Sequence, residues 1–137
     1  MNRWLFKSDP ETYGWKDLAQ AGKDTWDGVA NPVALKNLRK VQKGDEIFIY
    51  ETGDCKSIAG IAHAVSSGYP DPYDPKAVVC DLKAGKPLVR PVTLAEVKAN
   101  PALKDWELAR LPRLSVMPVS EKQWQEVLKM ANLLAGQ

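Results

Sequence analysis

Seven consecutive residues, Trp26 to Pro32, constrain the fold of this chain more than any other segment. Asn31 and Pro32 are residue types preferred at a helix N-cap and at the first helical position. An apolar periodicity follows, so a helix is predicted over Val33–Gln42. Trp26 then lies in a loop held at the helix mouth, where backbone N–H groups are unpaired. An indole fixed beside polar groups can recognise a flat polar ligand such as a nucleobase; the alternative is that Trp26 belongs to the core.

The length and composition indicate one globular domain over residues 1–137, because 45% of the residues are hydrophobic and 26% charged. A net charge of +2 argues against a protein whose affinity for nucleic acid depends mainly on many phosphate contacts. No run of eighteen apolar residues occurs, so we expect no membrane span. Cys55 and Cys80 lack a paired motif, which favours reduced thiols in a monomeric, cytoplasmic protein.

Short strands mixed with few helices predict an α+β domain, with the strands arranged as a small closed or nearly closed barrel. Strands are expected at Trp4–Lys7, Glu46–Tyr50, Ser57–Ser66 and Leu114–Val119, with a hairpin of Ala77–Leu82 and Leu88–Val92 around Lys83–Pro87. Tyr69–Asp74 is expected to be a loop because it contains two prolines. Helices are expected at Trp15–Ala21, Val33–Gln42, Leu94–Ala99 and after a capping box at Ser120, with a buried stripe of Trp124, Val127, Leu128, Ala131 and Leu134.

The chain carries no assembled catalytic machinery. Its single histidine, His63, lies on an alanine- and isoleucine-rich strand, where a structural role is favoured. One histidine and two scattered cysteines do not make a metal site, and no nucleophile elbow, phosphate loop or dinucleotide motif occurs. We therefore expect no catalytic residues, no metal and no cofactor.

Aromatic and polar residues near turns indicate ligand binding instead of catalysis. Rings able to face a cleft are Tyr13, Trp15, Trp26, Tyr50 and Tyr69, whereas Trp4, Trp106 and Trp124 are expected in the core. A pocket for one extruded base needs such stacking walls and polar groups for the Watson–Crick edge. Side chains that can supply these groups are Lys7, Ser8, Asp9, Asn31 and Ser115.

A basic face on the helix after Trp26 is the candidate phosphate-contacting surface. Its members recur with helical spacing and are Lys36, Arg39, Lys40 and Lys43. Phosphate contacts position a nucleic acid while a pocket reads its base. The alternative is that these side chains form only a solvated helix face.

Three motifs, Trp4–Pro10, Trp26–Pro32 and Arg113–Val119, occur in an order that resembles the EVE domain, a PUA-like family. The resemblance runs from about Trp4 to Trp124. It implies a PUA-like mixed β pseudo-barrel of five or six strands with surrounding helices. It also implies a relationship to the YTH domains, which read methylated adenine in RNA, and recognition of modified bases.

Residue by residue, the resemblance carries over to Lys7, Ser8, Pro10, Tyr13, Trp26, Asp27, Val29, Asn31, Tyr50, Arg113 and Ser115. The expected ligand-binding set is Lys7, Ser8, Asp9, Tyr13, Trp26, Asp27, Asn31, Tyr50, Arg113 and Ser115. The chain departs from the family pattern at three positions. Asp9 stands where glutamate is usual, Ala30 where arginine is usual, and Glu51 where histidine often follows the tyrosine. The last two changes alter the local charge and so bear on which base is preferred.

The leading hypothesis is a non-enzymatic module that binds a modified nucleobase in DNA or RNA. An enzyme or accessory acting on a small nucleotide is the alternative, with Asp9, Asp27 or Glu51 as acid or base. A third possibility is an interaction protein with a vestigial pocket. Within the leading hypothesis we expect Asn31 and Ser8 to set the base preference and Glu51 to tune it.

Overall fold

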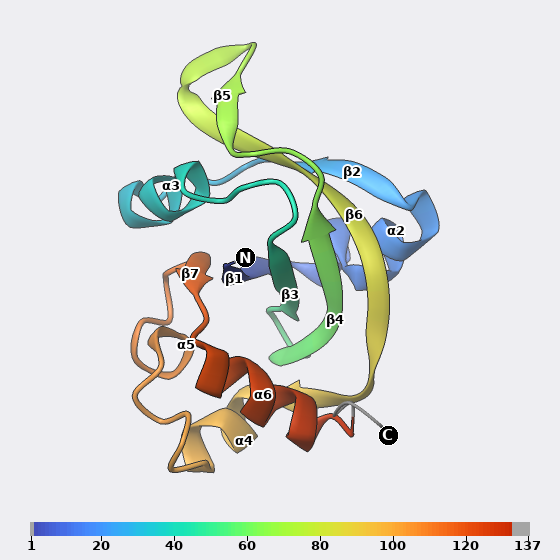
Figure 1. The fold of residues 1–137 in the computed structure, drawn as a ribbon, viewed down its shortest axis with the longest axis vertical. Helices are drawn as coiled ribbons and strands as arrows, with labels where there is room; N and C mark the ends of the chain where they lie inside the picture. Colours follow the sequence, from blue (N-terminus) through green and yellow to red (C-terminus); the bar gives the residue numbers. More distant parts are fainter. Residues whose placement is uncertain (1, 133–137) are drawn as a thin grey trace.

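The computed structural model describes residues 2–132, which form a curved mixed sheet surrounded by short helices (Figure 1). The strands are β1 (Arg3–Ser8), β2 (Lys23–Trp26), β3 (Glu46–Glu51), β4 (Ser57–Ala64), β5 (Tyr69–Asp71), β6 (Asp74–Thr93) and β7 (Val116–Pro118). The helices are α1 (Pro10–Tyr13), α2 (Trp15–Ala21), α3 (Pro32–Arg39), α4 (Leu94–Ala99), α5 (Glu107–Arg110) and α6 (Glu121–Met130). The predicted α+β class is confirmed.

The strand order is β2-β6-β4-β3-β1-β7, and β5 pairs with β6 outside this path. β1 and β3 are parallel, and the other pairs are antiparallel. Within residues 2–132 no pairing joins β7 to β2, so the seven-stranded sheet is open, whereas five or six strands in a closed or nearly closed barrel were expected. Helix α3 lies against β7, where Asn37 Nδ2 donates to the carbonyl of Val116 at 2.8 Å.

The predicted hairpin around Lys83–Pro87 is wrong, because β6 runs as one strand from Asp74 to Thr93 (Figure 1). β5 and β2 pair with its first half and β4 with its second half. Gly85 marks a close approach to β4, since a Cβ at this position would lie 2.5 Å from the carbonyl oxygen of Ile61. Pro87 lies opposite Gly60 of β4, beyond the stretch of β6 that pairs with β2.

Two short strands were not predicted. β5 lies within the segment expected to be a loop, and it forms with β6 an arm that projects from the sheet (Figure 1). β2 has three exposed residues and only one buried one, so it lacks an apolar alternation. Trp26 therefore ends an edge strand, opposite Cys80 of β6, and does not lie in the loop itself.

The capping signals of the sequence are confirmed at helix starts. Asn31 Oδ1 accepts hydrogen bonds from two N–H groups of the first turn of α3, at 2.9 and 3.1 Å. The helix was expected to reach Gln42 but ends at Arg39. The buried Asp45 carboxylate accepts from the Gln42 N–H at 3.0 Å, which holds the chain in a turn before β3.

Helix α6 begins at the predicted capping box. The Gln123 N–H donates to Ser120 Oγ at 3.1 Å, and the Ser120 N–H donates to Gln123 Oε1 at 2.9 Å. Of the expected stripe, Trp124, Val127 and Ala131 are buried, Leu128 is partly buried, and Leu134 lies outside the described residues.

The core holds Trp4, Trp106 and Trp124, as predicted. Phe48 of β3 stacks on Trp124 with ring centroids 3.8 Å apart. Asp45 is a buried carboxylate that accepts from Trp4 Nε1 at 2.9 Å. Because its oxygens also accept backbone N–H groups, this charge is satisfied inside the protein.

Candidate functional site

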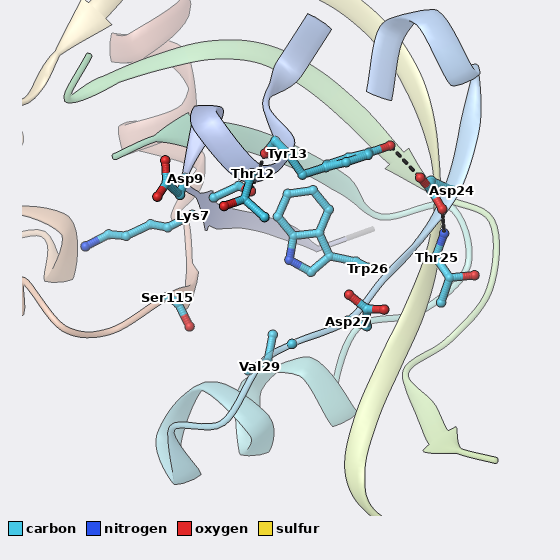
Figure 2. Close-up of a pocket in the computed structure, with 12 residues that line it drawn as sticks. Lys7, Asp9, Thr12, Tyr13, Asp24, Thr25, Trp26, Asp27, Val29 and Ser115 are labelled. Atoms are coloured by element: carbon cyan, nitrogen blue, oxygen red, sulfur yellow. Dashed lines mark hydrogen bonds between the residues drawn. The ribbon is translucent and has the colours of Figure 1, made fainter. Parts of the chain in front are cut away.

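Segments that are distant in the sequence surround a hollow of about 550 Å³, here called the Trp26 hollow (Figure 2). They are the end of β1, helix α1, strand β2 with the loop after it, and the residue before β7. The lining residues are Lys7, Ser8, Asp9, Thr12, Tyr13, Asp24, Thr25, Trp26, Asp27, Gly28, Val29 and Ser115.

Strand pairing explains why these segments meet. β1 runs antiparallel to β7, and the Lys7 N–H donates to the carbonyl of Ser115 at 2.9 Å. Ser8 Oγ donates to the carbonyl of Tyr13, which holds α1 at the end of β1. The pairing of β2 with β6 then brings Trp26 to the same place.

Trp26 is both a core residue and a wall of the hollow. It is only 8% exposed and packs against Phe6, with ring centroids 5.7 Å apart and planes at 47°. Tyr13 meets it edge-on at 6.3 Å and 82°. The indole Nε1 points towards the open space between Lys7, Asp27 and Val29 (Figure 2). The expected neighbourhood of Trp26 and Tyr13 is present, and its use for a base stays a prediction.

Tyr13 is fixed by its hydroxyl group. The hydroxyl donates to Asp24 Oδ2 at 2.6 Å, and the Thr25 N–H donates to the other carboxylate oxygen of Asp24 at 2.8 Å. Burial, with the Asp24 hydrogen bond and charge, raises the pKa of Tyr13 well above its ordinary value. The phenol is therefore a neutral donor, and its ring is held upright against Trp26.

Lys7 crosses one side of the hollow. Its Nζ donates to the carbonyl of Pro112 at 3.0 Å and lies 5.5 Å from the centroid of the Tyr50 ring. Burial lowers the pKa of Lys7. An ammonium group has three N–H donors, so a positioned Lys7 can still donate to a ligand acceptor.

Three carboxylates stand at the hollow, and two of them have structural partners. Asp9 Oδ1 accepts the N–H of Glu11 at the start of α1, at 2.9 Å, and Asp24 holds Tyr13. Asp27 is exposed and lies below the indole beside Val29 (Figure 2). Asp27 is thus the carboxylate best placed to accept a hydrogen bond from a ligand amine.

Three aromatic residues expected at the cleft are elsewhere, and one of them, Tyr69, lies on β5, where its hydroxyl donates to Asp81 Oδ1 at 2.8 Å. Tyr50 is 3% exposed and lies under Lys7 without lining the hollow. Trp15 is 7% exposed and packs on Gly60, where a Cβ would lie 2.4 Å from the indole. The Tyr50 and Trp15 rings belong to the core, because the strand and the helix that carry them turn these side chains inward.

Asn31 and Arg113 also lie outside the Trp26 hollow and line a second one. The hydrogen bonds of Asn31 do not favour the prediction that its amide sets the base preference. A paired amide contact needs both the oxygen and the nitrogen of the side chain, and the Asn31 oxygen already caps α3.

Glu51 does not reach the hollow either. Its Oε2 accepts the N–H of Trp15 at 3.0 Å, at the start of α2. A carboxylate is favourable at a helix N-terminus, where N–H groups lack intrahelical partners. Glu51 therefore fastens α2 to β3 and does not line the hollow, so the structure gives no support to the prediction that it tunes the base preference.

The basic residues Lys36, Arg39, Lys40 and Lys43, here called the α3 basic stretch, are all exposed. Two of them lie within α3, while Lys40 caps its C-terminus and Lys43 lies in the following turn. The stretch is therefore a basic surface that continues past the helix. Its contact with phosphates stays a prediction.

The structure adds lining residues that the sequence did not single out for this site. They are Thr12, Asp24, Thr25 and Gly28; Val29 also lines the hollow, and the family resemblance already indicated it. Gly28 and Val29 stand inside the Trp26–Pro32 motif, so the motif itself was a signal for them. Thr12, Asp24 and Thr25 carry no sequence pattern, because only the contact of α1 with β2 brings them to the hollow.

Other sites are not evident in the described part of the chain. Residues 2–132 contain no group of three or more histidine, cysteine, aspartate or glutamate side chains that could hold a metal ion. None of their helices is long and apolar enough to cross a membrane. Cys55 is exposed and Cys80 is buried, and both are free thiols.

The open mixed sheet and its surrounding helices define a PUA-like α+β domain. The EVE domain model matches residues 2–130, and the chain therefore belongs to the EVE-domain family. An alignment of 166 positions with human thymocyte nuclear protein 1 shows 30% identity and covers 94% of this chain and 73% of that protein.

Solved structures support the same assignment. Rpa0253 from Rhodopseudomonas palustris is 42% identical, with a TM-score of 0.92 over 98% of this chain and 95% of that chain. The crystal structure of human THYN1 in complex with DNA containing 5-methylcytosine is 27% identical. Its TM-score is 0.87, over 96% of this chain and 98% of that chain.

Proposed function

We propose that this chain is a non-catalytic module that binds a methylated cytosine base of DNA in the Trp26 hollow. The observation that carries the proposal is the hollow itself, in which a fixed indole stands beside a positioned ammonium group and an exposed carboxylate. The complex of a family relative with 5-methylcytosine DNA supports the class of ligand.

The lining residues supply the contacts that an extruded base requires. Trp26 offers a stacking surface, and base–aromatic stacking contributes about 1–3 kcal/mol per base. Lys7 Nζ can donate to the acceptors of a pyrimidine stacked on Trp26, while Asp27 can accept from an exocyclic amine. Val29 offers an apolar contact to a methyl group, for which burial of one carbon gives about 0.8 kcal/mol, or roughly fourfold in affinity.

Thymine is the most informative competitor, because it shares the methyl group of 5-methylcytosine and carries an oxygen in place of the amine. The proposed Asp27 contact favours the amine and repels the oxygen. We expect the order of affinity to be 5-methylcytosine, then cytosine, then thymine. RNA of the same sequence is the comparison that tests the preference for DNA.

The experiment measures fluorescence anisotropy of short oligonucleotides with one central variable position. Asp27→Ala is expected to reduce the preference for 5-methylcytosine over thymine, whereas Asp54→Ala, an exposed carboxylate outside the hollow, should leave it unchanged. Equal affinity for 5-methylcytosine and an abasic centre would refute the proposal. Turnover of the base, followed by mass spectrometry, would refute its non-catalytic part and favour the enzyme alternative.

A further inference from the structure

A second hollow of about 360 Å³, here called the Leu111 hollow, is lined by Asn31, Val33, Leu111, Pro112, Arg113 and Leu114. It exposes apolar surface to an unusual degree. Val33 is 54% exposed and Leu111 is 43% exposed, and both are among the few large hydrophobic side chains exposed in residues 2–132. Exposed apolar side chains that gather in a concave place mark a binding surface more often than scattered ones do.

The Leu111 hollow continues from the Trp26 hollow along the same two chain segments. Val29 lines the first hollow and Asn31 the second, and Ser115 lines the first while Leu114 lines the second. Lys7 joins them directly, because it lines the Trp26 hollow and its Nζ donates to the carbonyl of Pro112 at 3.0 Å. A nucleic-acid strand bound in one hollow can therefore extend into the other.

The chemistry of the Leu111 hollow suits a sugar and base better than a lone phosphate. Asn31 Oδ1 already takes N–H groups at the start of α3, so this helix end does not offer an open anion site. Val33 and Leu111 give aliphatic surface for the face of a base or the carbons of a sugar. Arg113 is exposed and forms no ion pair within residues 2–132, so its guanidinium can reach the phosphate that joins two nucleotides.

We propose that the Leu111 hollow is a subsite for the nucleotide adjacent, in the same strand, to the base held in the Trp26 hollow. This inference rests on the proposed function and extends it to the neighbouring nucleotide. It predicts that affinity depends on the presence of one flanking base, on either the 5′ or the 3′ side. It also predicts that a free nucleoside does not sense the subsite.

The test uses the full chain with oligonucleotides that carry central 5-methylcytosine and an abasic residue on the 5′ side, on the 3′ side or on neither. Removing the flanking base on one side should lower wild-type affinity about tenfold, which corresponds to roughly 50 Å² of buried apolar surface. Leu111→Ser should bind the intact oligonucleotide about tenfold more weakly and lose little more when that base is removed, because the two changes remove the same contact. Binding of free 5-methyldeoxycytidine should be unchanged in Leu111→Ser.

Val89→Ser is the matched control, because Val89 is 70% exposed on β6 and lines neither hollow. Full affinity of the wild type for both abasic-flanked oligonucleotides, with the central base still required, would overturn the subsite and leave the proposed function standing. Loss of dependence on the central base would overturn the proposed function, and the subsite with it. Self-association that Leu111→Ser abolishes, without any effect of flanking bases, would assign this surface to a second copy of the chain and also overturn the proposal.

Discussion

Replacing Trp26 by alanine removes an indole that packs in the core on one side and lines a hollow on the other. Truncating a buried tryptophan lowers the free energy of unfolding by about 3–5 kcal/mol. Because the Trp26 ring contacts Phe6 and Tyr13 but opens on the hollow, we expect the lower end of this range. A domain with a total stability of about 5–15 kcal/mol survives this loss, with a melting temperature lowered by roughly 10 °C.

The affinity for 5-methylcytosine oligonucleotides should fall by a further, separate amount. Loss of base stacking removes about 1–3 kcal/mol, which is roughly fivefold to more than a hundredfold in the dissociation constant. Fluorescence anisotropy well below the melting temperature measures this term, and differential scanning calorimetry measures the stability term.

Trp15→Ala is the matched control for this prediction. Trp15 is buried to almost the same degree, 7% exposed against 8% for Trp26, but it packs on Gly60 and does not line the hollow. It should lose similar stability and retain binding. Equal losses of affinity in Trp15→Ala and Trp26→Ala would show that both act through the fold, and would refute a stacking role for Trp26.

Glu51→His should keep the rank order of base affinities, because Glu51 makes no ligand contact; a changed rank order would return Glu51 to the site. Glu51→Ala should lower the free energy of unfolding by about 1 kcal/mol, because it removes a cap of α2. Reversing the charges of the α3 basic stretch should weaken oligonucleotide binding and its salt dependence while leaving binding of a free nucleoside unchanged; an unaltered salt slope would identify only a solvated surface. Cys55 should react with a thiol reagent in the native protein and Cys80 only after unfolding, since burial raises the pKa of Cys80 to about 11; rapid native reaction of two thiols would contradict this. Because the pKa of Tyr13 is raised by folding, its stabilising effect is complete below its ordinary pKa of 10.0 and is lost as the pH rises above it. Tyr13→Phe should therefore show a smaller alkaline loss of stability, measured by urea unfolding, and an identical pH profile would exclude this tyrosine.

Sequence by itself determined the features whose causes are local. Asn31 and Ser120 start α3 and α6, because a side-chain oxygen satisfies N–H groups only two or three residues away. The three motifs identified the EVE family and so indicated Lys7, Trp26 and Ser115 as neighbours before the fold was known. The α+β class followed from the same local patterns.

Tertiary structure alone decided the features whose causes are distant in the chain. β6 passes straight through Gly85 because β4 lies close beside it, although the same residues taken alone indicate a turn. Glu51 was expected at the ligand, but the proximity of α2 gives its carboxylate a backbone partner. Asp24 reaches the hollow only because α1 and β2 meet there, through the hydroxyl of Tyr13. Helix capping and apolar periodicity involve residues a few positions apart, so they can be predicted from the sequence. The hydrogen-bond partner of a side chain depends instead on which distant segments the sheet brings together.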